Sequence, residues 1–339
     1  MNRPEFAAAI REKYMKNPML DEATRIETYD ALFHTGTKLL EYFNSHDRIQ
    51  ISYSGGSDGD CIVHLVATYF PEFIEKCHFV FVNTGLEYDA TKRHIEETES
   101  RYGIKIDRVR GTSVVTACRE RGFPILSKHK SYFIDLYLRD KPSGYKIIFG
   151  DAIRSYHAMQ FTENQKKMVE HLKKNGIKVS DYCCEISKKK PLLKYHKEHK
   201  IDLLVTGERS AEGGRRALVH KSCFEACNSH AGGSDKFMPL FWWSDAVKAI
   251  FKQTEGIRYS DCYEVYGMRR TGCCGCPFNL NIADDLRAMF EYEPRLFKAC
   301  MKVFGQSYEL MDRFKCRRKK CLPDSFQMTL AGEIERSEP

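Results

Sequence analysis

The chain has 339 residues, 42% hydrophobic and 29% charged, which is the composition of a soluble globular protein that can bury a full core. No apolar run approaches the roughly 18 residues of a membrane span, and residues 1–5 lack a signal-peptide pattern, so we expect a cytoplasmic protein without a membrane partner. Fourteen cysteines in a chain expected to stay reduced indicate metal or redox chemistry rather than disulfides. The formal net charge of +8 fits an anionic partner, from a nucleotide to an RNA or DNA strand, although solvated lysines would explain it too.

The N-terminal part predicts helices and then a phosphate-binding turn. Residues 1–47 are patterned as amphipathic helices and should form an N-terminal helical cap. A short strand should follow, because Ile49 and Ile51 alternate into Tyr53. Residues 54–59 then form a turn with three glycines that leads into a helix. Such a turn lets backbone N–H groups approach oxygen atoms, and the helix N-terminus adds partial positive charge, so we predict phosphate binding; the alternative is an ordinary βα turn.

Two further βα units are predicted after this turn. Residues 78–85 are a nearly continuous apolar run typical of a buried parallel strand, a charged helix should span 89–102, and 104–109 supply a third strand. Consecutive βα units predict an α/β fold with a doubly wound parallel sheet. Binding sites in such sheets lie at the C-terminal ends of the strands, where the glycine-rich turn and residues 83–85 should lie.

The middle of the chain is less regular. Residues 131–180 are rich in lysine and are expected to form an insertion with one helix, at about 163–174. A helix should start at residue 190, a fourth strand should span 201–207, and a β-like segment is expected at 238–243. We therefore divide the chain into an N-terminal helical segment, 1–47; a nucleotide-binding domain, 48–260, with an insertion at about 131–180; a helical region associated with the late cysteines, 261–325; and a mobile tail, 326–339.

The glycine-rich turn resembles a known phosphate-binding motif. It is not the Gly-x-x-x-x-Gly-Lys-Ser/Thr loop, because no Lys-Ser or Lys-Thr follows the glycines. It resembles the Ser-Gly-Gly-x-Asp-Ser pyrophosphate loop (PP-loop) of the ATP pyrophosphatase superfamily, with Gly59 in place of the final serine. The resemblance implies an adenine nucleotide alpha hydrolase-like fold in which the loop holds the β,γ-phosphates of ATP or a related adenine nucleotide. It further implies a catalytic role for Asp58, which would hold Mg²⁺ or orient the loop, and nucleotide binding by Ser54, Gly55, Gly56 and Ser57.

The cysteines include two pairs with the spacing of metal ligands. Cys183 and Cys184 are adjacent, and Cys273 and Cys276 are separated by two residues. Four thiolates can hold a 4Fe–4S cluster or a tetrahedral zinc ion. Adjacent cysteines are unusual for structural zinc, but the residues alone leave a cluster, zinc and buried thiols open, and Cys274 is an alternative to Cys273.

The residues around these cysteines carry a family resemblance. The segments at 183–192 (Cys-Cys-Glu-Ile-Ser-Lys-Lys-Lys-Pro-Leu), 270–277 (Arg-Thr-Gly-Cys-Cys-Gly-Cys-Pro) and 83–85 (Asn-Thr-Gly) resemble the phosphoadenosine phosphosulfate (PAPS) reductase family. The similarity extends over about 48–280, and the tandem Cys-Cys with a distant Cys-x-x-Cys resembles the iron–sulfur adenylylsulfate reductases. It implies a 4Fe–4S cluster on Cys183, Cys184, Cys273 and Cys276, and nucleotide contacts from Asn83, Thr84 and Gly85.

A second anion-binding segment follows the predicted fourth strand. Residues 207–216 contain three arginines, and the planar guanidinium gives paired hydrogen bonds to phosphate or sulfate. The family has a similar Gly-x-Arg…Arg segment, which implies a catalytic role for Arg209 and anion binding by Arg215 or Arg216. A solvated, charge-balanced loop is the alternative.

Two departures from the sulfonucleotide reductases direct the functional prediction. Those enzymes attack sulfur with a cysteine in a C-terminal Glu-Cys-Gly-Leu/Ile-His motif, whereas Cys321, the last cysteine here, lies in Lys-Lys-Cys-Leu-Pro. They also usually lose the Gly-Gly-x-Asp of the loop, which this chain keeps. Both departures favour a cluster-bearing ATP pyrophosphatase similar to the enzymes that thiolate tRNA or DNA. In that interpretation an acceptor is adenylated, pyrophosphate leaves, a donor protein supplies sulfur, and the basic run 317–320 contacts the tRNA or DNA.

Two alternatives come from other classes of function. A divergent sulfonucleotide reductase would release sulfite and use Cys321 as its catalytic nucleophile. A non-catalytic nucleotide-binding subunit of a larger assembly would fit the replacement of the motif serine by Gly59.

Overall fold

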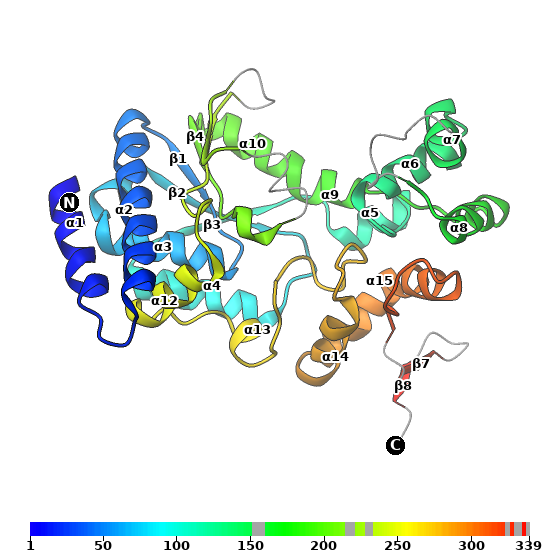
Figure 1. The fold of residues 1–339 in the computed structure, drawn as a ribbon. Helices are drawn as coiled ribbons and strands as arrows, with labels where there is room; N and C mark the ends of the chain where they lie inside the picture. Colours follow the sequence, from blue (N-terminus) through cyan, green and yellow to red (C-terminus); the bar gives the residue numbers. More distant parts are fainter. Residues whose placement is uncertain (151–159, 214–220, 228–232, 323–325, 329–333, 337–339) are drawn as a thin grey trace. The chain divides into compact units, whose positions relative to one another are not determined.

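The computed structural model describes residues 1–150, 160–213, 221–227, 233–322, 326–328 and 334–336 (Figure 1). The chain forms two compact units whose segments interleave along the sequence. Unit 1 consists of residues 1–82, 90–109 and 192–265, and unit 2 consists of residues 83–89, 110–191 and 266–339. The linear division predicted above, at residues 47, 260 and 325, remains a prediction beside this grouping.

Unit 1 contains the sheet and the helices that pack on it. A π-helical turn at Arg11–Met15 and 3₁₀ turns at Pro71–Lys76 and Ser210–Glu212 join its longer elements. Four of those elements, β2, α4, β3 and α10, have one end in unit 2. The elements are α1 (Arg3–Ile10), α2 (Glu22–Ser45), β1 (Ile49–Ser52), α3 (Ser57–Tyr69), β2 (Cys77–Asn83), α4 (Asp89–Tyr102), β3 (Ile106–Arg110), α10 (Lys190–His199), β4 (Leu203–Val205), β5 (Phe224–Glu225), β6 (Asp235–Phe237), α12 (Asp245–Glu255) and α13 (Asp261–Glu264).

The six strands are ordered β3-β2-β1-β4-β6-β5. β1 is parallel to β2 on one side and to β4 on the other, β6 is parallel to β4, and the short edge strand β5 is antiparallel. The chain leaves β1 towards β2 and β3 and later returns to add β4 on its other side, so β1 and β4 flank the point where the strand order reverses. Ligand crevices of open α/β sheets lie at this point, outside the carboxyl ends of the strands. The predicted doubly wound α/β fold is confirmed.

The sequence explains why β1 is central. All of Ile49, Gln50 and Ile51 are fully buried, as expected for a strand paired on both edges and covered on both faces. The predicted N-terminal helices form as well: Asp21 caps α2 by accepting from the backbone N–H of Thr24 at 2.9 Å. The apolar sides of α1, α2, α3 and α12 complete the core of this unit around β1.

Unit 2 is mainly helical. It contains α5 (Val114–Arg121), α6 (Lys128–Leu138), α7 (Pro142–Phe149), α8 (Glu163–Lys174), α9 (Tyr182–Cys184), a π-helical segment (Glu185–Lys189), α14 (Ile282–Tyr292) and α15 (Pro294–Arg313), and a short antiparallel pair, β7 (Phe326–Met328) and β8 (Ile334–Arg336). Figure 1 shows α6, α7 and α8 lying together, with α6 packed on both of the others. Among the helices that the structure describes, none combines the length and apolarity that a membrane crossing requires.

Three local predictions need correction. The predicted insertion at 131–180 contains α7 and most of α6 in addition to α8, because the apolar sides of α6 and α7 pack against each other. Residues 238–243 form turns rather than a β-like segment, and the strand is β6, just before them. The described part of the expected tail forms β7 and β8.

Candidate functional site

The glycine-rich loop connects β1 to α3 in unit 1. Gly55 has φ +67°, and a Cβ on it would lie 2.8 Å from Thr91 Cγ2, so both the backbone conformation and the space require glycine. Gly56 is the N-cap of α3 and offers no side chain to the first N–H groups of the helix. A 13-residue helix with uncapped N–H groups at its start has the geometry of an anion site, with Ser54 exposed in front of it and Ser57 in its first turn.

Two cations hold the predicted catalytic residue Asp58. Its Oδ1 accepts from Arg209 Nε at 2.8 Å and lies 2.8 Å from Lys248 Nζ. The same ammonium of Lys248 donates to Ser57 Oγ at 2.6 Å, so it joins the two loop residues. Positive charge thus collects at the first turn of α3, where the helix dipole already favours an anion.

Arg209 reaches the loop because its own backbone follows β4, the strand beside β1. Gly207 lies between them, and a Cβ on it would be 3.0 Å from Asp58 Cβ. The guanidinium also donates through Nη2 to Asp245 Oδ1 at 2.8 Å and through Nη1 to the Trp243 carbonyl at 3.2 Å. Burial acts to lower the pKa of Arg209, but the charges and hydrogen bonds of Asp58 and Asp245 outweigh it and raise that pKa. Arg215 and Arg216 lie outside the described residues.

The Asn-Thr-Gly segment belongs to unit 2. Thr84 is fully buried, and both its backbone N–H and its hydroxyl donate to Glu87 Oε1, at 3.1 and 2.6 Å. Asn83 Oδ1 accepts from the N–H of Gly85 at 2.9 Å. Thr84 also lies beside Cys273, where its hydroxyl acts to lower the pKa of that thiol. The structure therefore brings Thr84 next to a predicted metal ligand, whereas the predicted nucleotide contacts of Asn83, Thr84 and Gly85 remain a prediction.

The four predicted metal ligands share one neighbourhood in unit 2. Cys183 and Cys184 come from α9, and each influences the pKa of the other. The charges of Cys184 and Cys273 act to raise the pKa of Cys276, and the charge of Cys276 acts to raise the pKa of Cys183. Burial is the largest influence on Cys276 and raises its pKa to about 12, so the thiols are protonated unless a cation replaces their protons.

Two cysteines that sequence patterns did not single out lie in the same place. Cys118 on α5 hydrogen-bonds to Cys183 and is the largest cause of the raised pKa of that thiol. Cys300 on α15 packs against Gly275: a Cβ on this glycine would lie 2.8 Å from Cys300 Cβ. Only the fold brings these helices to the four predicted ligands, so no sequence spacing signalled them.

One lysine and one acid accompany the cysteines. Burial acts to lower the pKa of Lys188, but the charges of Cys273 and Glu87 outweigh it and raise that pKa. Lys188 in turn acts to lower the pKa of Cys273, although burial leaves that thiol with a raised pKa. A cationic side chain beside a thiol favours the thiolate, which is the form that binds a metal.

The Cys273–Cys276 loop is fixed by its backbone. Gly275 has φ +65°, its carbonyl accepts from the hydroxyl of Tyr308, and the N–H of Cys274 donates to the Leu86 carbonyl at 3.1 Å. Arg317 then donates to the carbonyls of Pro277, Asn279 and Leu126, the last two at 2.8 and 2.7 Å. Arg317 is thus engaged in holding this loop, which removes it from the basic run 317–320 expected to contact nucleic acid.

The cysteine set fits an iron–sulfur cluster in donor type and proximity. In the described residues, no group of three or more His, Cys, Asp or Glu side chains is already arranged to hold a metal ion. Protonated thiols have no charge that would draw them onto one point, so a cluster would have to displace their protons as it binds. Cys274 is fully buried and its N–H is tied to Leu86, which leaves Cys273 as the better placed of the two alternatives.

Cys321, the predicted nucleophile, is enclosed. It is fully buried, its N–H donates to Asp312 Oδ1 at 2.7 Å, and burial raises the pKa of its thiol to about 12. Cys316 is also buried, with its pKa raised to about 11 by burial. Neither thiol has the exposure or the depressed pKa of a nucleophilic cysteine.

Several solved structures are similar in part. A PAPS reductase from Candida auris in a phosphate complex is 13% identical, with a TM-score of 0.42, over 70% of this chain and 87% of its own. The FMN adenylyltransferase of Candida glabrata with FMN and an ATP analogue is 14% identical, with a TM-score of 0.45, over 80% and 70%. A tRNA thiolase of Methanococcus maripaludis with its 4Fe–4S cluster is 14% identical, with a TM-score of 0.38, over 89% and 82%. Similarity this low carries no conclusion about what this chain binds.

Curated relatives and a family model match the chain by sequence. One uncharacterized protein of Methanocaldococcus jannaschii is 26% identical over 69% of this chain, and a second is 23% identical over 83%. This chain spans only 38% and 54% of the length of these two relatives. The model of the phosphoadenosine phosphosulfate reductase domain matches residues 48–125 and 149–279, which include the loop, Arg209 and all four predicted ligands. The chain belongs to the phosphoadenosine phosphosulfate reductase domain family.

Proposed function

We propose that this chain is an iron–sulfur ATP pyrophosphatase that adenylates an acceptor and supports transfer of sulfur to it. The observation that carries the proposal is the pair of cations on Asp58 at the start of α3: Arg209 and Lys248 surround an uncapped, glycine-rich helix N-terminus. Backbone donors and cationic side chains at a helix N-terminus are groups that bind the phosphates of a nucleotide. A sulfonucleotide has no β,γ-phosphates for such a loop to hold.

In the proposed reaction ATP enters with Mg²⁺, and its β,γ-phosphates occupy the loop at residues 54–58. An oxygen of the acceptor attacks the α-phosphorus, the bond between the α-phosphorus and the bridging oxygen breaks, and pyrophosphate leaves. Backbone N–H groups of the loop, Lys248 and Arg209 stabilise the charge on that leaving group. Sulfide delivered by a donor protein then attacks the carbon or phosphorus that bears the adenylated oxygen, and AMP leaves with that oxygen.

The cysteine site is the second part of the proposal. Cys183, Cys184, Cys273 and Cys276 would hold a 4Fe–4S cluster, with Lys188 beside Cys273 to favour the thiolate. Because four thiolates would occupy all four irons, a bound cluster would supply a charged centre that helps to position the transferred sulfur rather than an iron that binds it. Thr84 and Glu87 would keep the neighbouring segment against Cys273, since their hydrogen bond ties its backbone together. A tRNA or DNA acceptor is proposed because its oxygens are targets for thiolation and the chain is basic.

The main alternative, a sulfonucleotide reductase, agrees with the family but not with the surroundings of Cys321. That mechanism needs an accessible thiolate, whereas Cys321 is fully buried and has a pKa of about 12. Sulfite release that is lost in Cys321→Ser would nevertheless favour the reductase.

The deciding experiment uses anaerobically purified protein. Iron and sulfide are measured first, followed by pyrophosphate release from ATP with and without tRNA or DNA, and by sulfite release from adenylylsulfate and from its 3′-phosphate. Iron with acceptor-stimulated pyrophosphate release is the expected result. ATP binding without any pyrophosphate release would instead favour a non-catalytic nucleotide-binding subunit, and zinc in place of iron would contradict the cluster.

A further inference from the structure

One stretch of unit 2 carries a large excess of positive charge. Residues 119–178 contain 13 lysines and arginines and 6 aspartates and glutamates, a net charge of +7 within a chain of +8. The remaining residues are therefore almost neutral. A net charge of this size within one stretch favours an anionic partner at that place.

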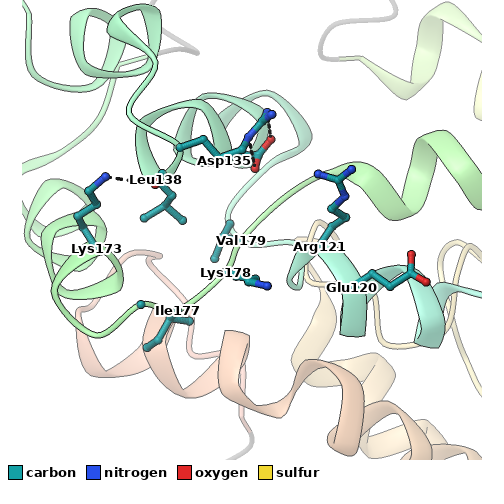
Figure 2. Close-up of a pocket in the computed structure, with 10 residues that line it drawn as sticks. Glu120, Arg121, Asp135, Leu138, Lys173, Ile177, Lys178 and Val179 are labelled. Atoms are coloured by element: carbon teal, nitrogen blue, oxygen red, sulfur yellow. Dashed lines mark hydrogen bonds and ion pairs between the residues drawn. The ribbon is translucent and has the colours of Figure 1, made fainter.

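This stretch encloses a groove with a volume of about 500 Å³. Figure 2 shows Arg121, Lys178 and Asp135 gathered around it. Arg139 and Lys173 also line the groove, so four basic side chains converge there, from α5, the C-cap of α6, α8 and the segment after α8. The acids at the groove are Glu120 and Asp135, which leaves the lining with a net positive charge.

Two of the four cations have no acidic partner. Neither Arg121 nor Lys178 forms an ion pair within the part of the chain that the structure describes, and both are exposed. The guanidinium of Arg121 lies 5.2 Å from the ring centre of Tyr182, which orients it without neutralising it. Two unpaired cations at one groove are available for oxygen atoms of a ligand.

The other two cations are held in place by acids. Arg139 is paired with Asp135 through two hydrogen bonds, Nε to Oδ1 at 3.0 Å and Nη2 to Oδ2. Lys173 donates to Asp140 Oδ1 at 2.6 Å and to the carbonyls of Tyr137 and Leu138 at 3.3 and 3.2 Å. Asp135 thus competes with any anion for Arg139.

Aromatic rings lie next to these cations. The ammonium of Lys173 is 5.4 Å from the ring centre of Tyr137, and the Tyr137 ring lies 6.4 Å from that of Tyr145 on α7. Tyr145 is 60% exposed although it is a large aromatic side chain. Tyr137 is half-buried, and neither ring is among the residues that line the groove, so Tyr145 is the exposed ring near it. An exposed ring near a basic groove is a usual component of sites that stack bases and bind a phosphate backbone.

We propose that this groove binds the phosphodiester backbone of a nucleic-acid strand, with Arg121 and Lys178 contacting phosphates and Tyr145 stacking on a base. The inference rests on the proposed function for the class of acceptor, but not on turnover of ATP. Repeated phosphates suit cations that come from four separate segments, whereas a single small anion would occupy only part of the groove.

The test measures binding of fluorescent tRNA and of a single-stranded DNA oligonucleotide to the full chain, without ATP, over a range of salt concentrations. The double variant Arg121→Ala/Lys178→Ala should bind roughly tenfold or more weakly at 0.1 M salt and lose about 1–2 from the slope of log K against log salt. The matched variant Arg11→Ala/Lys197→Ala removes one exposed arginine and one exposed lysine from unit 1 and should bind as the wild type does. The strand with the higher affinity shows whether the groove prefers RNA or DNA.

A second variant guards against a folding defect. Asp135→Asn releases Arg139 and should tighten binding several-fold, a change that a damaged protein would not produce. Unchanged binding in Arg121→Ala/Lys178→Ala would overturn the proposal, and so would competition by polyglutamate as strong as by unlabelled tRNA, because the partner would then be an acidic protein. Groove-dependent binding in a protein that releases no pyrophosphate would refute the proposed function and leave the groove assignment standing.

Discussion

A Cβ on Gly59 would lie 2.9 Å from Cδ2 of Tyr53, so the residue that replaces the motif serine faces a ring that leaves it no room. The ring cannot easily move, because Tyr53 is 1% exposed and its hydroxyl donates to Asp60 Oδ1 at 2.6 Å. The same hydroxyl lies 2.9 Å from Thr98 Oγ1. Glycine at position 59 and tyrosine at position 53 are therefore matched to each other.

Restoring the motif serine should damage the protein. We expect Gly59→Ser to lower the free energy of unfolding by about 1–3 kcal/mol, because the added atoms overpack a buried ring. Denaturant titration measures the loss, and Gly272→Ala is the control, since nothing lies within 4 Å of a Cβ at that position. If Gly59→Ser were as stable as the wild type, the Tyr53 ring would have moved to accommodate the serine without cost.

We expect Lys248 to contribute to ATP binding and Lys252, on the same helix, not to contribute. Replacing Lys248 by Gln removes the cation that bridges Ser57 and Asp58, so KM for ATP in the pyrophosphate assay should rise roughly tenfold or more. Lys252, one turn further along α12, pairs instead with Glu264 at 2.6 Å, and Lys252→Gln should leave KM unchanged. Equal effects of the two substitutions on KM would show that Lys248 has no specific role in ATP binding.

Serine substitutions should distinguish the proposed cluster ligands from the other cysteines by the content of bound iron and sulfide. Serine at position 183, 184, 273 or 276 should abolish or strongly reduce bound iron and sulfide, because each change removes one proposed thiolate ligand. Cys274→Ser and Cys321→Ser should retain both, and the latter should retain pyrophosphate release as well. If Cys274→Ser lost its iron and Cys273→Ser kept it, Cys274 rather than Cys273 would be the cluster ligand.

Glu255 should give the protein an acid-sensitive component of stability. It accepts from Lys13, Tyr14 and Tyr69 and lies 3.1 Å from His64 Nε2, and although burial acts to raise its pKa, these partners lower it to about 2. A lowered pKa in the folded state stabilises the protein above the usual carboxyl range, and this contribution disappears as pH falls from about 4.5 through 2. Its size is about 3 kcal/mol.

The check is the free energy of unfolding at pH 7 and at pH 3. Glu255→Gln should be less stable than the wild type at pH 7 and should lose less on acidification. Glu12→Gln, at a carboxylate whose side chain is 67% exposed, is the control and should follow the wild type. Parallel curves for Glu255→Gln and the wild type would contradict the assignment.

For Asp285 we predict the opposite dependence of the free energy of unfolding on pH. Burial raises its pKa to about 7, and the charge of Asp284 adds to the rise although Asn279 donates to it. A raised carboxyl pKa makes the folded state bind the proton more tightly, so stability is greatest below the unfolded pKa and falls as pH rises through 7. Asp285→Asn should therefore stabilise the protein at pH 8 by roughly 2–4 kcal/mol and have little effect at about pH 3.5, below the unfolded pKa. Asp284→Asn, at a side chain 67% exposed, should change neither value much.

Local signals in the sequence were sufficient for much of the fold. Helices α4 and α8 form over the residues predicted, because charged and apolar positions alternate at helical spacing and Thr162 starts α8 with a capping box to Gln165. The strand–turn–helix at the loop forms as predicted because its glycines admit one backbone path. Helix α7 was missed since its pattern is short and its stability comes from packing on α6.

Contacts between distant segments account for the residues that were missed. Lys248 is one of 54 lysines and arginines, and only the addition of β4 beside β1 brings α12 to the loop. Cys118 and Cys300 have no ligand spacing to each other or to the predicted four. Thr84 was recognised as part of a motif, but its hydrogen bond to Glu87 and its position beside Cys273 depend on how unit 2 packs.

The position of β1 between β2 and β4 also bears on how the protein is made. One edge of β1 can pair as soon as residues 77–80 have left the ribosome, but the other edge needs residues 203–205. At about 5–20 residues per second, the roughly 150 residues between the end of β1 and the start of β4 take on the order of 8–30 s to synthesise. During that time the strand that carries the phosphate-binding loop has an open edge, so the nascent chain should depend on chaperones until β4 arrives.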